Sequence, residues 1–154
     1  MKRCDKIYAH PLYKEHMEII RKAEKDRKFC LHDLAHAMDV ARIGRIIIAE
    51  RHLDIDTELF YAAALLHDAA RYCGKPHNIS GAELAARIMP DCGFSSDETS
   101  SVCNAIRCHR RDGGANEFSK VLYEADKRSR MCFDCTAADE CYWEEEKRNL
   151  TIDI

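Results

Sequence analysis

Side chains that commonly bind metal ions recur along the sequence, each in a segment whose apolar residues repeat at helical spacing. They are His36, the adjacent pair His67 and Asp68, His109 and Asp126. The pair ends an apolar run, residues 59–66, where an imidazole and a carboxylate are costly to bury without compensation. A bound divalent cation is the simplest compensation, so the pattern indicates a metal-dependent enzyme.

Imidazoles and carboxylates together form a mixed nitrogen and oxygen ligand set, which suits Fe, Mn, Zn, Co or Ni better than calcium. Separate helices of a bundle can aim such residues at one central point. A cation there lowers the pKa of bound water toward about 7 and stabilises a phosphoryl oxygen, so the predicted chemistry is hydrolysis. A second pair, His32 and Asp33, shows that this dipeptide also arises by chance, so the context of each pair matters.

The elements that must position these residues are predicted to be helices almost throughout. Asp56 is a plausible N-cap, and capping-box patterns begin at Ser80 and Ser95. No stretch alternates apolar and polar residues as a strand would, so we expect an all-α, single-domain helical bundle of about six helices. The predicted helices are 13–28, 31–51, 57–72, one that begins near 80, one that begins near 95, and 117–131, the last after a turn at 111–114.

The composition is that of one globular domain, because 46% of the 154 residues are apolar and 33% are charged. A net charge of -3 argues against stable nucleic-acid binding, and the apolar runs are too short to cross a membrane. The first residues carry charge without an apolar run behind them, so we expect no secretory signal and a cytoplasmic location. We expect a helical domain over residues 1–131 and a cysteine-rich extension, residues 132–154, packed on it.

Three segments resemble the HD-domain superfamily of metal-dependent phosphohydrolases. They are residues 35–42 (AHAMDVAR), residues 63–71 (AALLHDAAR) and residues 123–127 (YEADK), and their order, apolar context and approximate spacing agree over roughly residues 30–130. The resemblance implies an all-α fold and phosphoester hydrolysis, usually on nucleotides. It also implies that one metal ion is bound by His36, His67, Asp68 and Asp126.

Two further histidines resemble the extra ligand positions of HD subgroups that hydrolyse dinucleoside polyphosphates or cyclic dinucleotides. His109 follows a helical segment in which Ile106 faces inward, and His77 precedes another helix. If both bind metal, the site holds two ions or one six-coordinate ion. His77 could instead be a loop residue or a contact to the substrate.

A phosphorylated substrate also requires cations close to the metal. Arg71 and Lys75 are the better candidates, because they follow the His67-Asp68 pair closely, and Asp68 is assigned the general-base or water-orienting role. His32 shares a helix face with His36 and either reaches the site or is a partly exposed residue at the helix start. Further cations flank His109 and Asp126: Arg110, Arg111, Lys127 and Arg128.

The C-terminal extension carries Cys132, Cys135 and Cys141 in C-x2-C-x5-C spacing, which is suited to a zinc ion or an iron-sulfur cluster. A fourth ligand must come from elsewhere, and Cys30 is the best candidate because it starts the His36 helix; Cys4 and Cys73 are the others. The chain has nine cysteines, an odd number, which favours reduced thiols over a disulfide framework. The alternative is a set of reduced, half-buried thiols without metal.

The sequence therefore predicts a metal-dependent phosphohydrolase with one or two divalent transition metals and a phosphorylated small molecule, such as a nucleotide, as substrate. A di-iron HD-type oxygenase is the first alternative, because extra histidines would permit it. A non-catalytic nucleotide or redox sensor is the second. The pattern leaves the metal, the substrate and the oligomeric state open.

Overall fold

The computed structural model describes residues 2–110 and 114–152, and the chain in these ranges forms helices without any strand. The all-α fold expected from the sequence is confirmed. The helices are α1 (Lys2–Ala9), α2 (Pro11–Ala23), α3 (Leu34–Glu50), α4 (Thr57–Leu66), α5 (His77–Asp91), α6 (Ser96–Cys108) and α7 (Glu117–Arg128), followed by the 3-10 turns η1 (Cys132–Asp134), η2 (Ala138–Glu140) and η3 (Glu145–Lys147).

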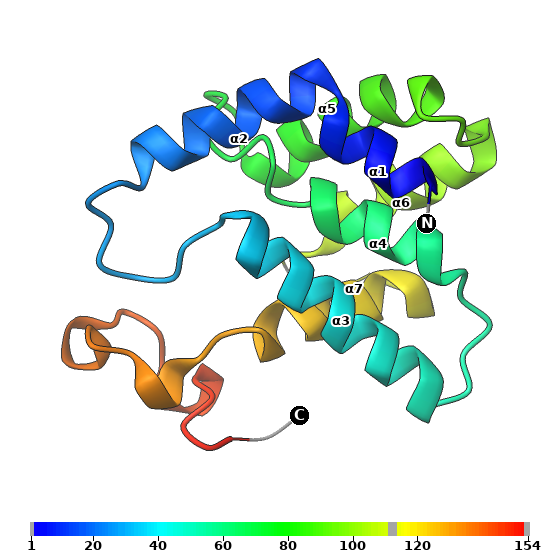
Figure 1. The fold of residues 1–154 in the computed structure, drawn as a ribbon. Helices are drawn as coiled ribbons and strands as arrows, with labels where there is room; N and C mark the ends of the chain where they lie inside the picture. Colours follow the sequence, from blue (N-terminus) through cyan, green and yellow to red (C-terminus); the bar gives the residue numbers. More distant parts are fainter. Residues whose placement is uncertain (1, 111–113, 153–154) are drawn as a thin grey trace.

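Helix α4 is the centre of the bundle. Every residue from Phe60 to Leu66 is buried, because a helix that is apolar on all sides is stable only when other helices surround it. It packs against α1, α3, α5, α6 and α7. Figure 1 shows α3 and α7 below it and α1, α2 and α5 above it.

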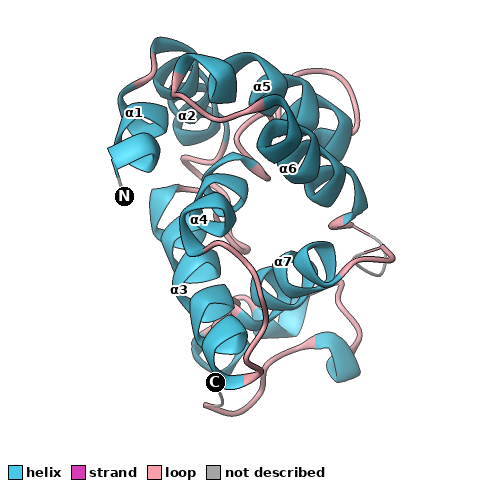
Figure 2. Cartoon of the chain, turned by 90° about the vertical axis from the view of Figure 1, so that its right-hand side faces the viewer, coloured by secondary structure: helices cyan, strands magenta, loops and turns pink. Residues whose placement is uncertain are grey.

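Helices α3 and α7 pack on each other, and α5 packs on α6, so the bundle has two helix pairs on different sides of α4 (Figure 2). A glycine allows the close approach of α3 to α4: a Cβ at Gly44 would lie 2.0 Å from Cε1 of Phe60. The loop between α2 and α3 and the C-terminal segment lie at the same end of the bundle (Figure 1). No helix in the described ranges is long and apolar enough to span a membrane.

The predicted helix boundaries are correct where a cap determines them. Ser95 and Glu98 form the expected capping box, in which the Glu98 N–H donates to Ser95 Oγ and the Ser95 N–H donates to the Glu98 carboxylate. Asp56 caps α4 as predicted, by accepting from the Leu59 N–H at 2.7 Å. Helix α4 ends at Leu66 rather than near 72, so His67 and Asp68 lie at the turn after it.

Other boundaries differ from the prediction. The capping box predicted at Ser80 is wrong, because α5 begins at His77 after Pro76, whose ring already fixes a backbone angle suited to a helix start. Helix α1 was not expected, and α7 ends at Arg128, three residues before the predicted end. Most of the turn predicted at 111–114 lies outside the described residues.

Candidate metal centre

Four predicted ligands from three parts of the bundle meet in one group. His36 lies in the first turn of α3, His67 and Asp68 follow α4, and Asp126 is on α7. Their ligand atoms all lie within 4.8 Å of one another. Nε2 of His36 is 3.3 Å from Nε2 of His67 and 3.4 Å from Oδ1 of Asp126. The packing of α3, α4 and α7 therefore produces the arrangement that a single cation requires.

A second group shares Asp68 with the first. It contains Asp68, His77 at the start of α5 and His109 at the end of α6. Oδ1 of Asp68 lies 3.3 Å from Nε2 of His77 and 3.7 Å from Nε2 of His109, whereas Oδ2 lies 3.4 Å from Nε2 of His67. The two carboxylate oxygens thus face different histidines. This geometry could hold two cations with Asp68 between them.

The hydrogen bonds of the imidazoles define which nitrogen faces the centre. Nδ1 of His67 donates to the Ala64 carbonyl at 2.8 Å, and Nδ1 of His109 donates to the Ile106 carbonyl at 2.5 Å, since a carbonyl can only accept. In a neutral ring, Nε2 then carries a lone pair that points into the site. Partners of this kind are typical of metal-binding histidines, because they hold the ring in the right tautomer and orientation.

His36 is held in the same way by Ser129. The Ser129 hydroxyl donates to the Asp126 carbonyl at 2.8 Å, so its oxygen accepts from Nδ1 of His36 at 3.3 Å. Nε2 of His36 and Nε2 of His67 consequently face each other, and with both rings neutral this is favourable only with positive charge between them. The donor set therefore fits a divalent transition metal, as the sequence predicted.

The charges of the site also favour a cation. Burial alone would lower the pKa of His67, but the carboxylates of Asp68 and Asp126 outweigh it and raise this pKa to about 10. Burial alone would raise the pKa of Asp68, but His67 and His109 hold it well below its ordinary value. The pKa of Asp126 is also held well below its ordinary value, by His36, His67 and Lys127 against the effect of burial. Both carboxylates are therefore ionised and buried, and they attract positive charge.

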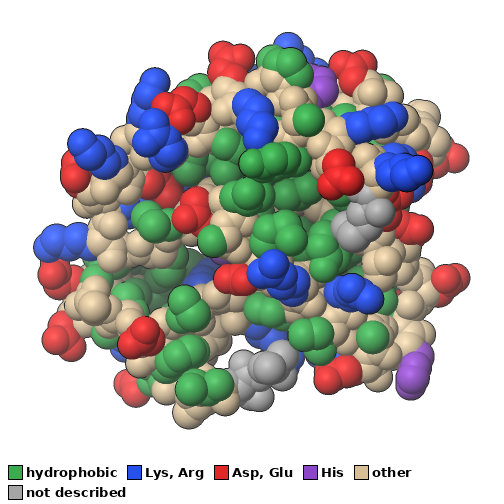
Figure 3. Space-filling model, viewed as in Figure 1, with side chains coloured by type: hydrophobic (Ala, Val, Ile, Leu, Met, Phe, Trp, Pro, Cys, Tyr) green, Lys and Arg blue, Asp and Glu red, His purple; other side chains and the backbone are tan. Residues whose placement is uncertain are grey.

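The metal centre opens into a pocket of about 640 Å³. His36, Asp68, His77, His109 and Asp126 line its inner part, and the α2–α3 loop and the C-terminal segment form its outer walls. Figure 3 shows a recess between these two segments, on the left of the view. A small molecule can therefore reach the ligand residues from solvent.

The predicted phosphate-binding cations differ in position. Arg71 lines the pocket, and its Nη1 lies 3.4 Å from Oδ1 of Asp68. Lys75 is not among the described residues that line the pocket, and its Nζ lies 2.9 Å from Oε1 of Glu83. Its position therefore gives no support to a catalytic role.

Of the flanking cations, Arg110 and Lys127 line the pocket, and Lys127 contacts Oδ2 of Asp126. Arg128 points to Glu124, with its Nε 3.3 Å from Oε1. Arg111 lies outside the described residues. Arg27, in the loop after α2, is a pocket cation that the sequence did not indicate.

Glu24 is a functional candidate that sequence reasoning missed. This carboxylate is 5% exposed and accepts hydrogen bonds from the His32 backbone N–H, at 2.8 Å, and from the Tyr72 hydroxyl, at 2.7 Å. It also lies 2.6 Å from Nδ1 of His32, whose Nε2 is 3.9 Å from Oδ2 of Asp68. His32 thus reaches the edge of the metal centre. Glu24 had only one sequence signal, its place on the same helical face as Met17 and Ile20.

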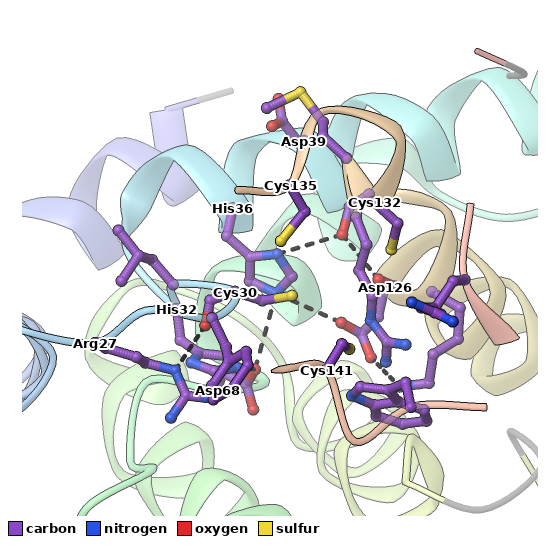
Figure 4. Close-up of a pocket in the computed structure, with 18 of the residues that line it drawn as sticks. Arg27, Cys30, His32, His36, Asp39, Asp68, Asp126, Cys132, Cys135 and Cys141 are labelled. Atoms are coloured by element: carbon purple, nitrogen blue, oxygen red, sulfur yellow. Dashed lines mark hydrogen bonds and ion pairs between the residues drawn. The ribbon is translucent and has the colours of Figure 1, made fainter. Parts of the chain in front are cut away.

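Four cysteines lie in the wall of the same pocket: Cys30, Cys132, Cys135 and Cys141 (Figure 4). Cys4 donates to the Glu58 carbonyl, and Cys73 is near His16, so among the three candidates for a fourth ligand Cys30 is the one at the pocket. Metal binding by these cysteines stays a prediction.

Comparison with known proteins identifies relatives over most of the chain. Residues 31–131 match the family model of the HD domain. An uncharacterized protein of Clostridium beijerinckii is 37% identical over 156 residues, 99% of this chain and 99% of that protein. Ribonuclease Y of Acetivibrio thermocellus is 29% identical over 117 residues, which are 76% of this chain and 21% of that enzyme.

A solved structure is similar as well. It is the crystal structure of a predicted HD superfamily hydrolase from an uncultured Thermotogales bacterium, with a TM-score of 0.64 and 30% identity over 88% of this chain and 80% of that chain. The region that matches the family model contains both His/Asp groups. It begins after Cys30 and ends before Cys132.

Proposed function

Because the chain belongs to the HD domain family, we propose that it is a metal-dependent phosphohydrolase that acts on a nucleotide or a related phosphoester. The observation that carries this proposal is the pair of His/Asp groups that share Asp68 at the bottom of an open pocket. Two cations about 3.5–4 Å apart are a recurrent arrangement in phosphoester hydrolysis.

His36, His67, Asp68 and Asp126 would hold one ion, and Asp68, His77 and His109 a second. Fe, Mn, Zn, Co and Ni all suit these donors. When bound, such an ion supplies Lewis acidity at a phosphoryl oxygen and lowers the pKa of water. The two carboxylate oxygens of Asp68 face different ligand groups, so this residue orients both sites. It does not act as a proton acceptor, because His67 and His109 hold its pKa well below the ordinary value against the effect of burial.

The chain's own residues then bind and orient the substrate. Arg71 and Lys127 each contact a carboxylate of the centre. The Arg71 guanidinium or the Lys127 ammonium group can therefore bind a phosphoryl oxygen next to the metal ligands. His32 belongs to neither ligand group, and Glu24 contacts its Nδ1, so its Nε2, 3.9 Å from Oδ2 of Asp68, can exchange a proton with the substrate.

The outer pocket supports a nucleotide over a simple phosphate. Phe29, Tyr142 and Trp143 line it, and the Tyr142 and Trp143 rings are stacked with centroids 5.8 Å apart. Aromatic faces of this kind bind nucleobases by stacking. Arg27 on the same wall provides charge for a further phosphate.

The test is hydrolysis by the purified chain, loaded in turn with each of the five metals. The substrate panel contains nucleoside mono- and diphosphates, dinucleoside polyphosphates and cyclic dinucleotides. We expect turnover of at least one substrate, lost by more than about a hundredfold in Asp68→Ala and retained in Asp54→Ala, an exposed carboxylate outside the pocket. A metal-loaded protein that hydrolyses no member of the panel would contradict the proposal.

The shared carboxylate also favours a second candidate, a di-iron oxygenase, because two irons could lie on either side of Asp68. Oxygen consumption that requires two irons and a substrate would select it over hydrolysis. Binding of nucleotide without turnover in either assay, unchanged in Asp68→Ala, would select the sensor function instead.

A further inference from the structure

The cysteines in the pocket wall come from two distant parts of the chain. Cys30 is in the loop before α3, whereas Cys132, Cys135 and Cys141 are in the C-terminal segment, and all four lie outside the region that matches the family model. Figure 4 shows their sulfur atoms turned toward the same space beside His36 and Asp126. All four thiols are free. The tertiary structure has therefore gathered four potential metal ligands that the His/Asp centre does not use.

Tight turns present the three C-terminal thiols. The Cys135 N–H donates to the Cys132 carbonyl at 3.3 Å and closes η1, and the Cys141 N–H donates to the Ala138 carbonyl at 3.2 Å and closes η2. Two cysteines separated by two residues in such a turn can bind one centre together. Each C-terminal cysteine thus begins or directly follows a 3-10 turn.

The segment that carries these turns has almost no core of its own. Among residues 132–152, Ala137 is the buried side chain, while Tyr142 is 70% and Ile152 is 83% exposed. It is linked to the bundle by an exposed ion pair from Lys28 to Glu140, by an edge contact between the Tyr142 and Phe29 rings, and by three hydrogen bonds from the Asn149 amide to carbonyls at the end of α7. These are few links for a segment without a core, and an exposed ion pair contributes only about 0–1 kcal/mol. A bound metal centre is the usual link in small segments without a core.

Two half-buried arginines in the same wall each carry one buried nitrogen that could donate to an anionic group. Arg130 Nη1 and Arg148 Nε are buried and find no hydrogen-bond partner in the part of the chain that the structure describes. Both residues line the pocket together with the four cysteines. Buried guanidinium donors need an acceptor, and metal-bound thiolates and sulfides supply acceptors with net negative charge. Neutral thiols would leave these donors unsatisfied.

An iron-sulfur cluster and a single ion require different spacings of the sulfur atoms. In a tetrahedral zinc site with bonds of about 2.3 Å, neighbouring thiolates are about 3.8 Å apart. Among the described residues, the potential ligand groups whose atoms lie within 4.8 Å of one another contain none of the cysteines. An iron-sulfur cluster places each thiolate on a different iron, so its ligands lie farther apart than those of one ion.

We propose that Cys30, Cys132, Cys135 and Cys141 bind one four-iron, four-sulfide cluster in the wall of the pocket. The cluster fastens the C-terminal segment to the loop before α3, and Arg130 and Arg148 offset its charge. The cluster and the His/Asp centre line one pocket, so a substrate bound between them contacts both walls. This inference does not rest on the proposed hydrolysis.

The test is iron and acid-labile sulfide in the full chain, purified without oxygen. We expect about four sulfides per chain and a visible absorption that dithionite bleaches. Sulfide distinguishes the cluster from iron at the His/Asp centre, so His77→Ala should keep its sulfide whether or not the enzyme is active. Cys132→Ser and Cys30→Ser should lose it, and Cys73→Ser, an exposed thiol outside the pocket, should keep it.

Three results would overturn the proposal: no sulfide in the anaerobic protein, sulfide that survives both pocket cysteine substitutions, or zinc in place of iron at the cysteines. The far-UV circular dichroism of each variant shows whether the bundle is folded. We expect it to match wild type, because none of the four cysteines lies in an α-helix.

Discussion

The two ligand-rich regions of this protein are ordered in opposite ways. The histidines of the metal centre are held by the bundle itself: His67 and His109 donate to carbonyls of their own helices, and His36 donates to Ser129. The cysteine segment has one buried side chain, Ala137, and is joined to the bundle by a few polar links and one ring contact. The comparison teaches that a packed core prepares a site before its ligand arrives, whereas a segment without a core depends on its ligand for order.

Removal of bound metals should affect the two regions very differently, and this is the largest expected effect. Chelator and oxidant together should lower the amide-exchange protection of residues 132–152 by about a hundredfold or more, because little else orders them. Amides of α4 should stay protected, because that helix is buried on all sides. Hydrogen exchange read by mass spectrometry measures both regions in one sample. Equal protection of residues 132–152 before and after removal would break the comparison.

Gly44→Ala should weaken the bundle and disturb the site less than Gly81→Ala does. The new Cβ would lie 2.0 Å from the buried Phe60 ring, so the ring or α3 must shift, and overpacking of this kind costs about 1–3 kcal/mol of unfolding free energy. Urea denaturation measures the loss. Gly81→Ala is the matched variant, because its Cβ would lie 2.9 Å from the His67 carbonyl and so disturbs the metal centre as well. If Gly44→Ala lowered metal affinity more than Gly81→Ala, this separation of core from site would be incorrect.

Ser129→Ala should lower metal affinity by about tenfold, because partners that orient a metal-binding histidine typically contribute 10–100-fold. The hydroxyl accepts from Nδ1 of His36 and donates to the Asp126 carbonyl, so its loss frees the ring. Competition with a coloured chelator measures the affinity. Ser129→Thr keeps the hydroxyl and should restore most of it. Unchanged affinity in the alanine variant would show that packing alone orients His36.

Arg3→Ala should give the smallest effect, about 1 kcal/mol or less, because its partners are partly exposed. The guanidinium joins α1 to Glu58 and Glu98, each at 2.8 Å. Arg3 lowers the pKa of Glu58. The pKa of Glu98 is lowered first by the Ser95 backbone N–H and then by Arg3. A carboxyl group whose pKa is lower in the folded than in the unfolded state stabilises the fold at pH values above the unfolded-state pKa. This stabilisation is lost as the pH falls through the folded-state pKa. Thermal unfolding of both proteins should therefore differ at neutral pH and converge in acid.

Much of the fold and of the candidate site could be predicted from short sequence patterns. The His67-Asp68 pair after an all-apolar run marked both the central helix and its buried polar end, and Ser95 to Glu98 marked a helix start, since caps depend only on neighbouring residues. The capping pattern at Ser80 was misleading, because the helix begins earlier, directly after Pro76. Ser80 is buried where α5 passes close to the His67 carbonyl at Gly81, a tertiary contact that the sequence does not show.

The order of the residues along the chain determined which side chains could bind metal and that they would lie on helices or at helix ends, because periodicity and ligand chemistry are local properties. The packing of the helices decided the rest: that Asp68 faces two histidine groups, that Glu24 holds His32, that Lys75 pairs with Glu83, and that Cys30 meets the C-terminal cysteines. These distances join segments remote in sequence, and they depend on helix crossing angles and on which face each helix buries.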